Sequence, residues 1–206
     1  MSIPPILQPD RSYTFRSYFE MTYEPEDILA EFGYSLQRTL LDLARYPVKI
    51  DRFAILQEQL QRRLTFISLT SEAARREMLI APILVEVAET AHAQLRIEYP
   101  LTVSEYLKGS LDYYLYTQSQ CLVVKAKHAD LARGFTQLAM ELIALAQRQT
   151  DEIPFLVGAV TTGDIWQFGK LDRNAKQITQ GTKLYVIPDE LETLLSILVA
   201  VLVPQF

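Results

Sequence analysis

Cysteine, histidine and glycine are scarce in this sequence of 206 residues, which has one cysteine, two histidines and seven glycines. The single cysteine, Cys121, cannot form an intramolecular disulfide, and we therefore expect a reducing, cytoplasmic location. Two histidines and one cysteine cannot supply the four ligands of a zinc finger. The sequence also contains no glycine-rich phosphate loop and no nucleophile elbow, so it lacks two common signatures of nucleotide-binding and hydrolytic enzymes.

Long apolar runs are missing as well. The longest, Leu194–Val203, is too short to span a bilayer, and we expect no membrane partner. This run predicts a buried terminal helix or a subunit contact, which makes a homodimer through the C-terminal helix plausible. The first residues do not combine a basic stretch with an apolar stretch, so we expect no signal peptide.

Basic residues are outnumbered, since 20 lysines and arginines face 25 aspartates and glutamates and give a net charge of -5. Nonspecific affinity for nucleic acid comes mostly from basic side chains that displace counterions. A nucleic-acid partner is therefore expected to bind weakly, through a local basic patch. The sequence does not identify a protein partner.

The remaining composition, 49% hydrophobic and 22% charged, is typical of a globular protein, and the length suits one domain. Residues 1–69 are predicted to form an N-terminal aromatic and helical extension, and residues 70–206 a core with a C-terminal helix. The patterns of the core predict, in order, a helix from Ser71 with a kink at Pro82, a strand at 94–100, a hairpin at 110–127, a helix at 130–148, strands at 155–163 and 164–172, and a helix at 188–202 with Asp189 and Glu192 in a capping box.

This order, α-β-β-β-α-β followed by another strand and a helix, predicts an α/β fold with a mixed sheet flanked by helices. The hairpin strands should be antiparallel, and the strands on either side of the second helix should be parallel. If Tyr116 pairs with Cys121 across the hairpin turn "TQSQ", Asp112 lies opposite Lys125, and Lys127 points to the same face. A register shifted by one residue would move Lys125 to the other face.

A resemblance follows from these residues. The hairpin with its aspartate, the strand ending in "VVKAK" and the helix beginning "DLARGFTQLAMELIAL" resemble the PD-(D/E)xK nuclease superfamily, which has the restriction-endonuclease-like fold. More narrowly, the run "TSEAARREMLIAPIL…EYPL…LKGSLDYYL…GFTQLAMELIAL…GAVTTGDIWQFGKL" is similar to a family of cyanobacterial proteins with that fold. The resemblance covers Thr70 to the C-terminus.

The resemblance implies that Asp112 binds a divalent metal and that Lys127 orients the attacking water or stabilises charge on phosphate. The acidic residue of the motif should stand where this chain has Lys125. A divalent ion beside an ammonium group at about 4 Å meets roughly 8 kcal/mol of repulsion at an effective dielectric constant of about 20. The alternative is an ion pair between Lys125 and Asp112 across the two strands.

Two carboxylates are candidate substitutes: Glu141, one helical turn after Gln137, and Glu86 in the earlier helix. Both are equally consistent with solvated helix surface. The predicted catalytic residues are Asp112, Lys125, Lys127, Gln137 and Glu141, and the predicted metal ligands are Asp112, Glu141 and Glu86.

Two hypotheses of function follow. In the first, which the charge of the site favours, the metal site is degenerate and the protein is a non-cleaving binding or interaction module. In the second, the protein is a Mg²⁺-dependent endonuclease that hydrolyses DNA phosphodiesters with Asp112, Lys127 and Glu141. Magnesium is expected only in the second case.

Overall fold

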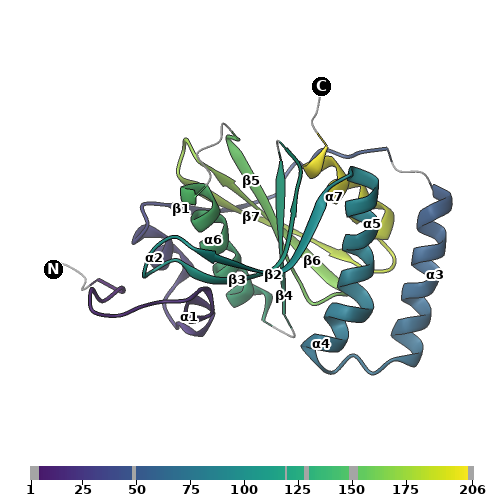
Figure 1. Ribbon diagram of the computed structural model, residues 1–206, viewed down its shortest axis with the longest axis horizontal. Helices are drawn as coiled ribbons and strands as arrows, with labels where there is room; N and C mark the ends of the chain where they lie inside the picture. The colour runs from purple at the N-terminus through teal and green to yellow at the C-terminus, as the bar shows by residue number, and fades with distance from the viewer. Residues whose placement is uncertain (1–4, 48–49, 119, 128–129, 149–152, 204–206) are drawn as a thin grey trace.

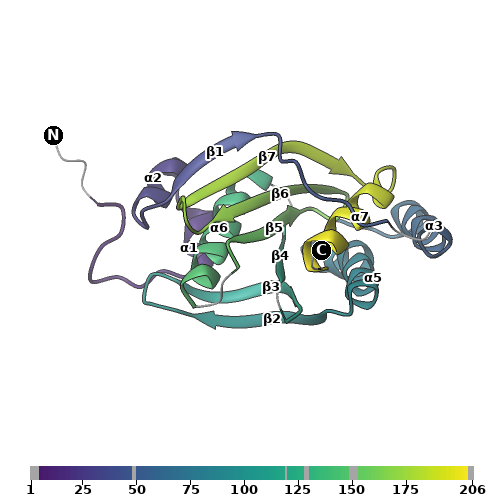
Figure 2. The same cartoon turned by 90° about the horizontal axis from the view of Figure 1, so that it is seen from above.

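A computed structural model describes residues 5–47, 50–118, 120–127, 130–148 and 153–203. Within these residues, seven strands form one mixed sheet in the order β1-β7-β6-β5-β4-β3-β2 (Figure 2). The strands are β1 (Ser35–Thr39), β2 (Gln94–Thr102), β3 (Lys108–Tyr116), β4 (Cys121–Ala126), β5 (Phe155–Thr161), β6 (Ile165–Asp172) and β7 (Gln177–Val186). The pairs β4–β5 and β1–β7 are parallel and the other neighbours are antiparallel.

Helices cover both faces of the sheet (Figure 1). They are α1 (Phe15–Glu20), α2 (Pro25–Ala30), α3 (Ile50–Phe66), α4 (Glu72–Arg75), the π-helical turn η1 (Arg76–Ile80), α5 (Ala81–Ala91), α6 (Leu131–Arg148) and α7 (Leu191–Leu202). The predicted mixed α/β architecture, the antiparallel hairpin and the parallel β4–β5 pair joined by α6 are confirmed.

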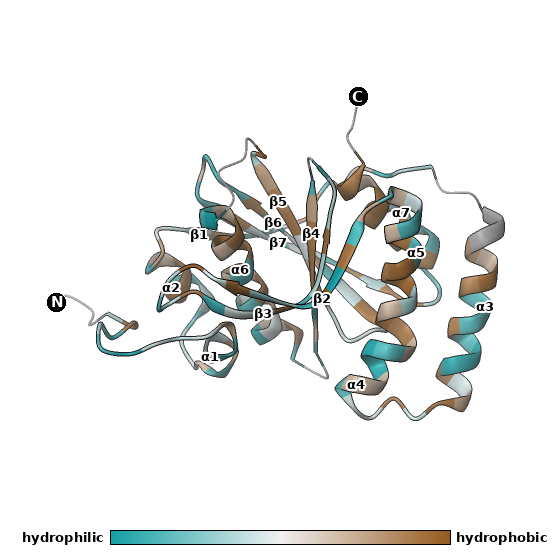
Figure 3. Ribbon diagram, viewed as in Figure 1, coloured by the Kyte–Doolittle hydropathy of each residue, from teal (hydrophilic) through white to brown (hydrophobic). Residues whose placement is uncertain are grey.

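The sheet separates two apolar cores. One lies between the sheet and α3, α5 and α7, and contains Trp166 and Leu198. The other lies beneath α1, α2 and α6, and contains Phe15 and Leu142. Strands β4 and β5 are apolar along most of their length, as Figure 3 shows, because the two cores cover them from both sides.

The N-terminal extension is an integral part of this arrangement. Helix α1 packs against α6 and β3, and β1 joins the sheet beside β7. The approach of α1 depends on Gly109 of β3, where a Cβ atom would lie 2.8 Å from the Phe15 ring. Strands β1 and β7 were not predicted, because their sequences are mostly polar and lack a clear strand pattern. They become strands by pairing with each other, and β7 also pairs with β6.

The helix predicted from Ser71 begins as expected, with the Ser71 hydroxyl accepting a hydrogen bond from Ala74 N. In place of a simple kink, the π-helical turn η1 precedes Pro82. Because Pro82 has no N–H, it cannot bond to the Met78 carbonyl in an α-helix. The guanidinium of Arg63, on α3, donates to that carbonyl at 2.9 Å, which satisfies it and ties the two helices together.

The C-terminal helix, α7, is buried over most of its residues, which confirms the prediction of a buried terminal helix. Its capping box was predicted wrongly. The N-cap is Glu190 and not Asp189. The Glu190 carboxylate does not bond to the first turn of the helix but accepts a hydrogen bond from Val186 N at the end of β7. The homodimer through this helix stays a prediction. Among the described residues, none of the helices is long and apolar enough to cross a membrane.

Candidate functional site

The site is built where β3 and β4 separate. Their paired residues run from Tyr116 and Cys121 to Tyr113 and Val124, which is the register that the sequence predicted. Beyond this pair the Asp112 carboxylate continues the contact between the strands, since its Oδ2 accepts a hydrogen bond from Ala126 N at 2.9 Å. Asp112 is thereby held by the backbone of the neighbouring strand.

Lys125 lies between two carboxylates. Its Nζ is 2.7 Å from Oδ1 of Asp112 and 3.2 Å from Oε1 of Glu141. The side chains of Lys125 and Glu141 are 6% and 0% exposed. Gln137 donates from Nε2 to the same Glu141 oxygen at 3.2 Å. The structure therefore brings four of the predicted residues together, and Glu141 belongs to the interior rather than to the helix surface.

Burial and charge set the protonation of this group. Burial raises the pKa of Glu141 to about 7, with the Lys125 ammonium opposing the rise and the Asp112 charge adding to it. Burial also opposes the charge of Lys125, but the Glu141 and Asp112 carboxylates outweigh it, so the pKa of Lys125 is raised. Lys125 is consequently an ammonium group at neutral pH and balances the charges around it.

Lys127, the fifth predicted residue, follows β4 and belongs to the same site. Its backbone N–H donates to Thr161 O at 2.8 Å, and its ammonium lies 4.1 Å from the centre of the Phe19 ring. The stem of Lys127 rests on Gly134 of α6, where a Cβ atom would lie 2.9 Å from its Cγ. Burial lowers the pKa of Lys127 and is the largest cause of the shift, and the charge of Lys125 lowers it further.

Asp112, Lys125, Lys127 and Gln137 line a cleft of about 680 Å³, and Glu141 is buried behind Lys125. One wall comes from the N-terminal extension, to which no predicted site residue belongs. The other walls come from β3, β4, α4 and the start of α6. The lining residues are Thr14, Phe15, Arg16, Phe19, Glu20, Glu72, Gly109, Ser110, Asp112, Lys125, Lys127, Asp130 and Gln137. The cleft carries both signs of charge, so it suits a small polar ligand better than a uniformly anionic one.

Glu86, the third predicted metal ligand, is not brought to this cleft. It lies on α5 and lines a separate hollow between α3 and α5, together with Ile55 and Glu77. Among the residues that the structure describes, no three histidine, cysteine, aspartate or glutamate side chains are grouped so that they could hold a metal ion.

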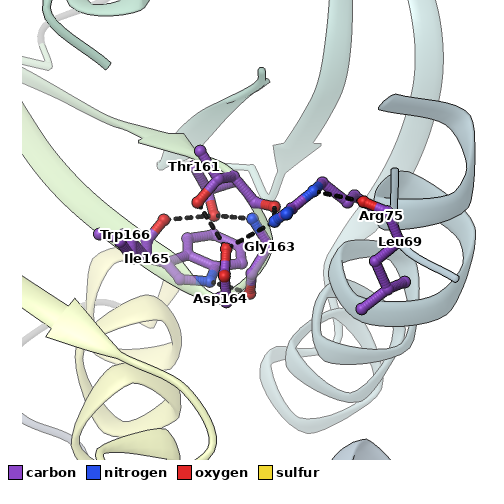
Figure 4. Close-up of polar contacts among 8 residues, drawn as sticks. Leu69, Arg75, Thr161, Gly163, Asp164, Ile165 and Trp166 are labelled. Atoms are coloured by element: carbon purple, nitrogen blue, oxygen red, sulfur yellow. Dashed lines mark hydrogen bonds and ion pairs between the residues drawn. The ribbon is translucent and has the colours of Figure 1, made fainter. Parts of the chain in front are cut away.

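A second polar cluster fixes the start of α4, which carries Glu72 of the cleft wall. Arg75 bonds to the carbonyls of Leu69 and Thr162 and pairs with Asp164 at 2.8 Å (Figure 4). In the same turn, Trp166 Nε1 donates to the Gly163 carbonyl. No local pattern predicts this contact, because Arg75 and Asp164 lie far apart along the chain.

Replacing Arg75 with methionine is expected to lower the free energy of unfolding by about 1–3 kcal/mol, because three half-buried acceptors lose their donor. The shift in the midpoint of urea unfolding measures this loss. Arg62→Met is the matched control, since Arg62 pairs with Glu58 only at the surface of α3 and should leave the midpoint unchanged. Equal shifts for the two variants would contradict the role given to Arg75.

Comparisons of this chain with protein-family models, with curated proteins and with solved structures find no match.

Proposed function

We propose that this protein is a metal-independent binding or interaction module of the restriction-endonuclease-like fold, in which the Lys125 ammonium takes the place of a catalytic cation. The succession α5, β2, β3, β4, α6 and β5 has the α-β-β-β-α-β order of that fold and supports the proposal. The positions of Asp112 and Lys127 support it further, since both lie at one end of the β3–β4 hairpin and line one cleft.

The observation that carries the proposal is the position of Lys125 Nζ, within 3.2 Å of both a β3 and an α6 carboxylate. An ammonium group in this place supplies the positive charge that two buried carboxylates require. The cluster of Asp112, Lys125 and Glu141 does not fit Mg²⁺ as it stands, because a divalent ion about 4 Å from the ammonium would meet roughly 8 kcal/mol of repulsion. Cleavage chemistry through a metal is therefore not part of the proposed function.

A Mg²⁺-dependent endonuclease is the second candidate, and the burial of Glu141 beside Asp112 favours it. Glu141 is the substitute carboxylate that such an enzyme would need, and both carboxylates contact one cationic group. Asp112 and Glu141 would hold the ion after Lys125 has moved away, and Lys127 would face the phosphate. Metal-dependent nicking of plasmid DNA by the unchanged protein, abolished in Asp112→Ala, would establish this candidate and reject the first.

A thermal-shift titration with Mg²⁺ and Mn²⁺ tests the proposed function. The melting temperature of the unchanged protein is expected to shift no more than in a control salt of equal ionic strength without divalent metal. Lys125→Glu adds a third carboxylate to Asp112 and Glu141 and is expected to gain a metal-dependent rise in melting temperature. At a metal concentration of 100 times Kd the rise is roughly 5–10 °C for a chain of this size.

Lys125→Gln is the matched control, because it also removes the ammonium but adds no charge. It should gain much less from metal than Lys125→Glu. If Lys125→Glu fails to fold without metal, refolding with and without Mn²⁺, followed by circular dichroism, reads out the same effect. A metal response of the unchanged protein equal to that of Lys125→Glu would overturn the proposal.

A further inference from the structure

The two lysines of the cleft are in different situations. Lys125 is held by two carboxylates, whereas Lys127 has no ion-pair partner within 4 Å among the described residues. The ammonium of Lys127 instead lies 4.1 Å from the centre of the Phe19 ring and lines the cleft. Lys127 is therefore a half-buried amine that lines the cleft and contacts an aromatic ring but no carboxylate of the described residues.

The position of this amine is built by three elements. Gly134 leaves room for the Lys127 stem, because a Cβ atom there would lie 2.9 Å from Lys127 Cγ. The backbone N–H of Lys127 is fixed by Thr161, at the end of β5. Phe19, on α1, then shields one side of the amine from water. A side chain held in this way presents its Nζ to the cleft in a defined place.

The surroundings of Lys127 favour its neutral, nucleophilic form. Burial has the largest effect on its pKa and lowers it, and the Lys125 ammonium lowers it further. The carboxylates of Asp112, Glu72 and Glu141 act in the opposite direction but do not reverse the shift. The Phe19 ring acts in the same direction as these carboxylates, because its face attracts the ammonium form. A lysine desolvated beside a second cationic group is a known way to activate an amine.

We infer that Lys127 is a nucleophilic amine that binds small aldehydes or ketones in this cleft as an imine. The amine nitrogen adds to the carbonyl carbon, the carbonyl oxygen takes up the proton that nitrogen loses, and the carbinolamine then releases water. No oxidant or reductant is needed. The inference rests on the proposed function, because it requires that Lys125 stays an ammonium in the cleft, and it names the class of ligand that the cleft accepts.

Reductive methylation with formaldehyde and cyanoborohydride, followed by mass spectrometry of peptides, tests the inference on the unchanged protein between pH 6.5 and 9. Each unit by which a lysine pKa falls raises the free-amine fraction near neutral pH about tenfold. Near pH 7, Lys127 is therefore expected to react faster than Lys176, which the ratio of the two methylation rates measures. Lys176 serves as the internal reference because it is exposed on the same molecule, away from the cleft.

A second arm uses propanal with the same reductant and weighs the intact protein. Near pH 7, one propyl group is expected on Lys127 beside the one on the N-terminal amine, whose ordinary pKa is about 8, and Lys127→Arg is expected to lose only the former. Lys183→Arg removes an exposed lysine away from the cleft and should retain the adduct, so it controls for the loss of any one lysine. Methylation of Lys127 no faster than that of Lys176 over the whole pH range would overturn the inference. That result would leave the metal titration, and with it the proposed function, unaffected.

Discussion

Lys125→Met is expected to lower the free energy of unfolding by about 3–5 kcal/mol, which is the usual cost of leaving buried charges without their partner. Methionine fills a similar volume but leaves the Asp112 carboxylate, only 14% exposed, without its cation. The fully buried Glu141, whose pKa the Lys125 ammonium holds down, must then take up a proton. For a domain of this size the melting temperature should fall by roughly 10 °C. Urea unfolding followed by circular dichroism measures the loss.

Lys127→Met is the matched control for this prediction. Lys127 lines the same cleft but forms no ion pair with any described residue, so the change should cost about 1 kcal/mol or less. Adding Asp112→Asn and Glu141→Gln to Lys125→Met should recover much of the lost stability, because the uncompensated charges then disappear together. If Lys125→Met were no more destabilising than Lys127→Met, Lys125 would not be the counter-charge of the site.

Between pH 5 and 7 the stability of the protein is expected to fall, and Glu141→Gln is expected to remove this fall. The pKa of Glu141 is raised from its ordinary value to about 7 in the folded protein by burial. The folded protein therefore binds a proton that the unfolded chain has already released. The resulting stabilisation is complete below the unfolded pKa and is lost as the pH rises through 7, which amounts to about 3 kcal/mol.

Urea midpoints at half-unit steps of pH, for the unchanged protein and for Glu141→Gln, give the difference curve. Other carboxyl groups do not obscure it, since the pKa values of Glu26, Glu105 and Glu190 are lowered and their effects fall at more acidic pH. Glu192→Gln, at an exposed position on α7, is the control and should follow the unchanged protein. Parallel curves for Glu141→Gln and the unchanged protein would show that Glu141 does not take up this proton.

Local patterns in the sequence were enough for the centre of the fold. The hairpin turn fixed the register of β3 against β4, and this register placed Asp112 beside Lys125, as the structure shows. The spacing of apolar residues predicted α6, and the connection through α6 predicted that β4 and β5 are parallel. Such features depend on neighbours only a few residues away, so the sequence records them directly.

Glu141 shows where local patterns stopped being sufficient. The apolar stripe of α6 defined the side of the helix that faces a core, but not what covers the rest of the helix. The structure turns Glu141 toward β4, where it meets Lys125, so Glu141 is fully buried although its place in the sequence is equally typical of helix surface. Its contact with Lys125 and its raised pKa both follow from that burial.

The sequence by itself thus determined the hairpin, the flanking helices and the ion pair between Asp112 and Lys125, because these rest on periodicity and on the length of one turn. Only the tertiary structure decided that β1 pairs with β7, that Phe19 covers Lys127 and that Arg75 meets Asp164. Each of these contacts joins segments distant in the chain and depends on the packing of whole elements, which periodicity and turn length do not encode.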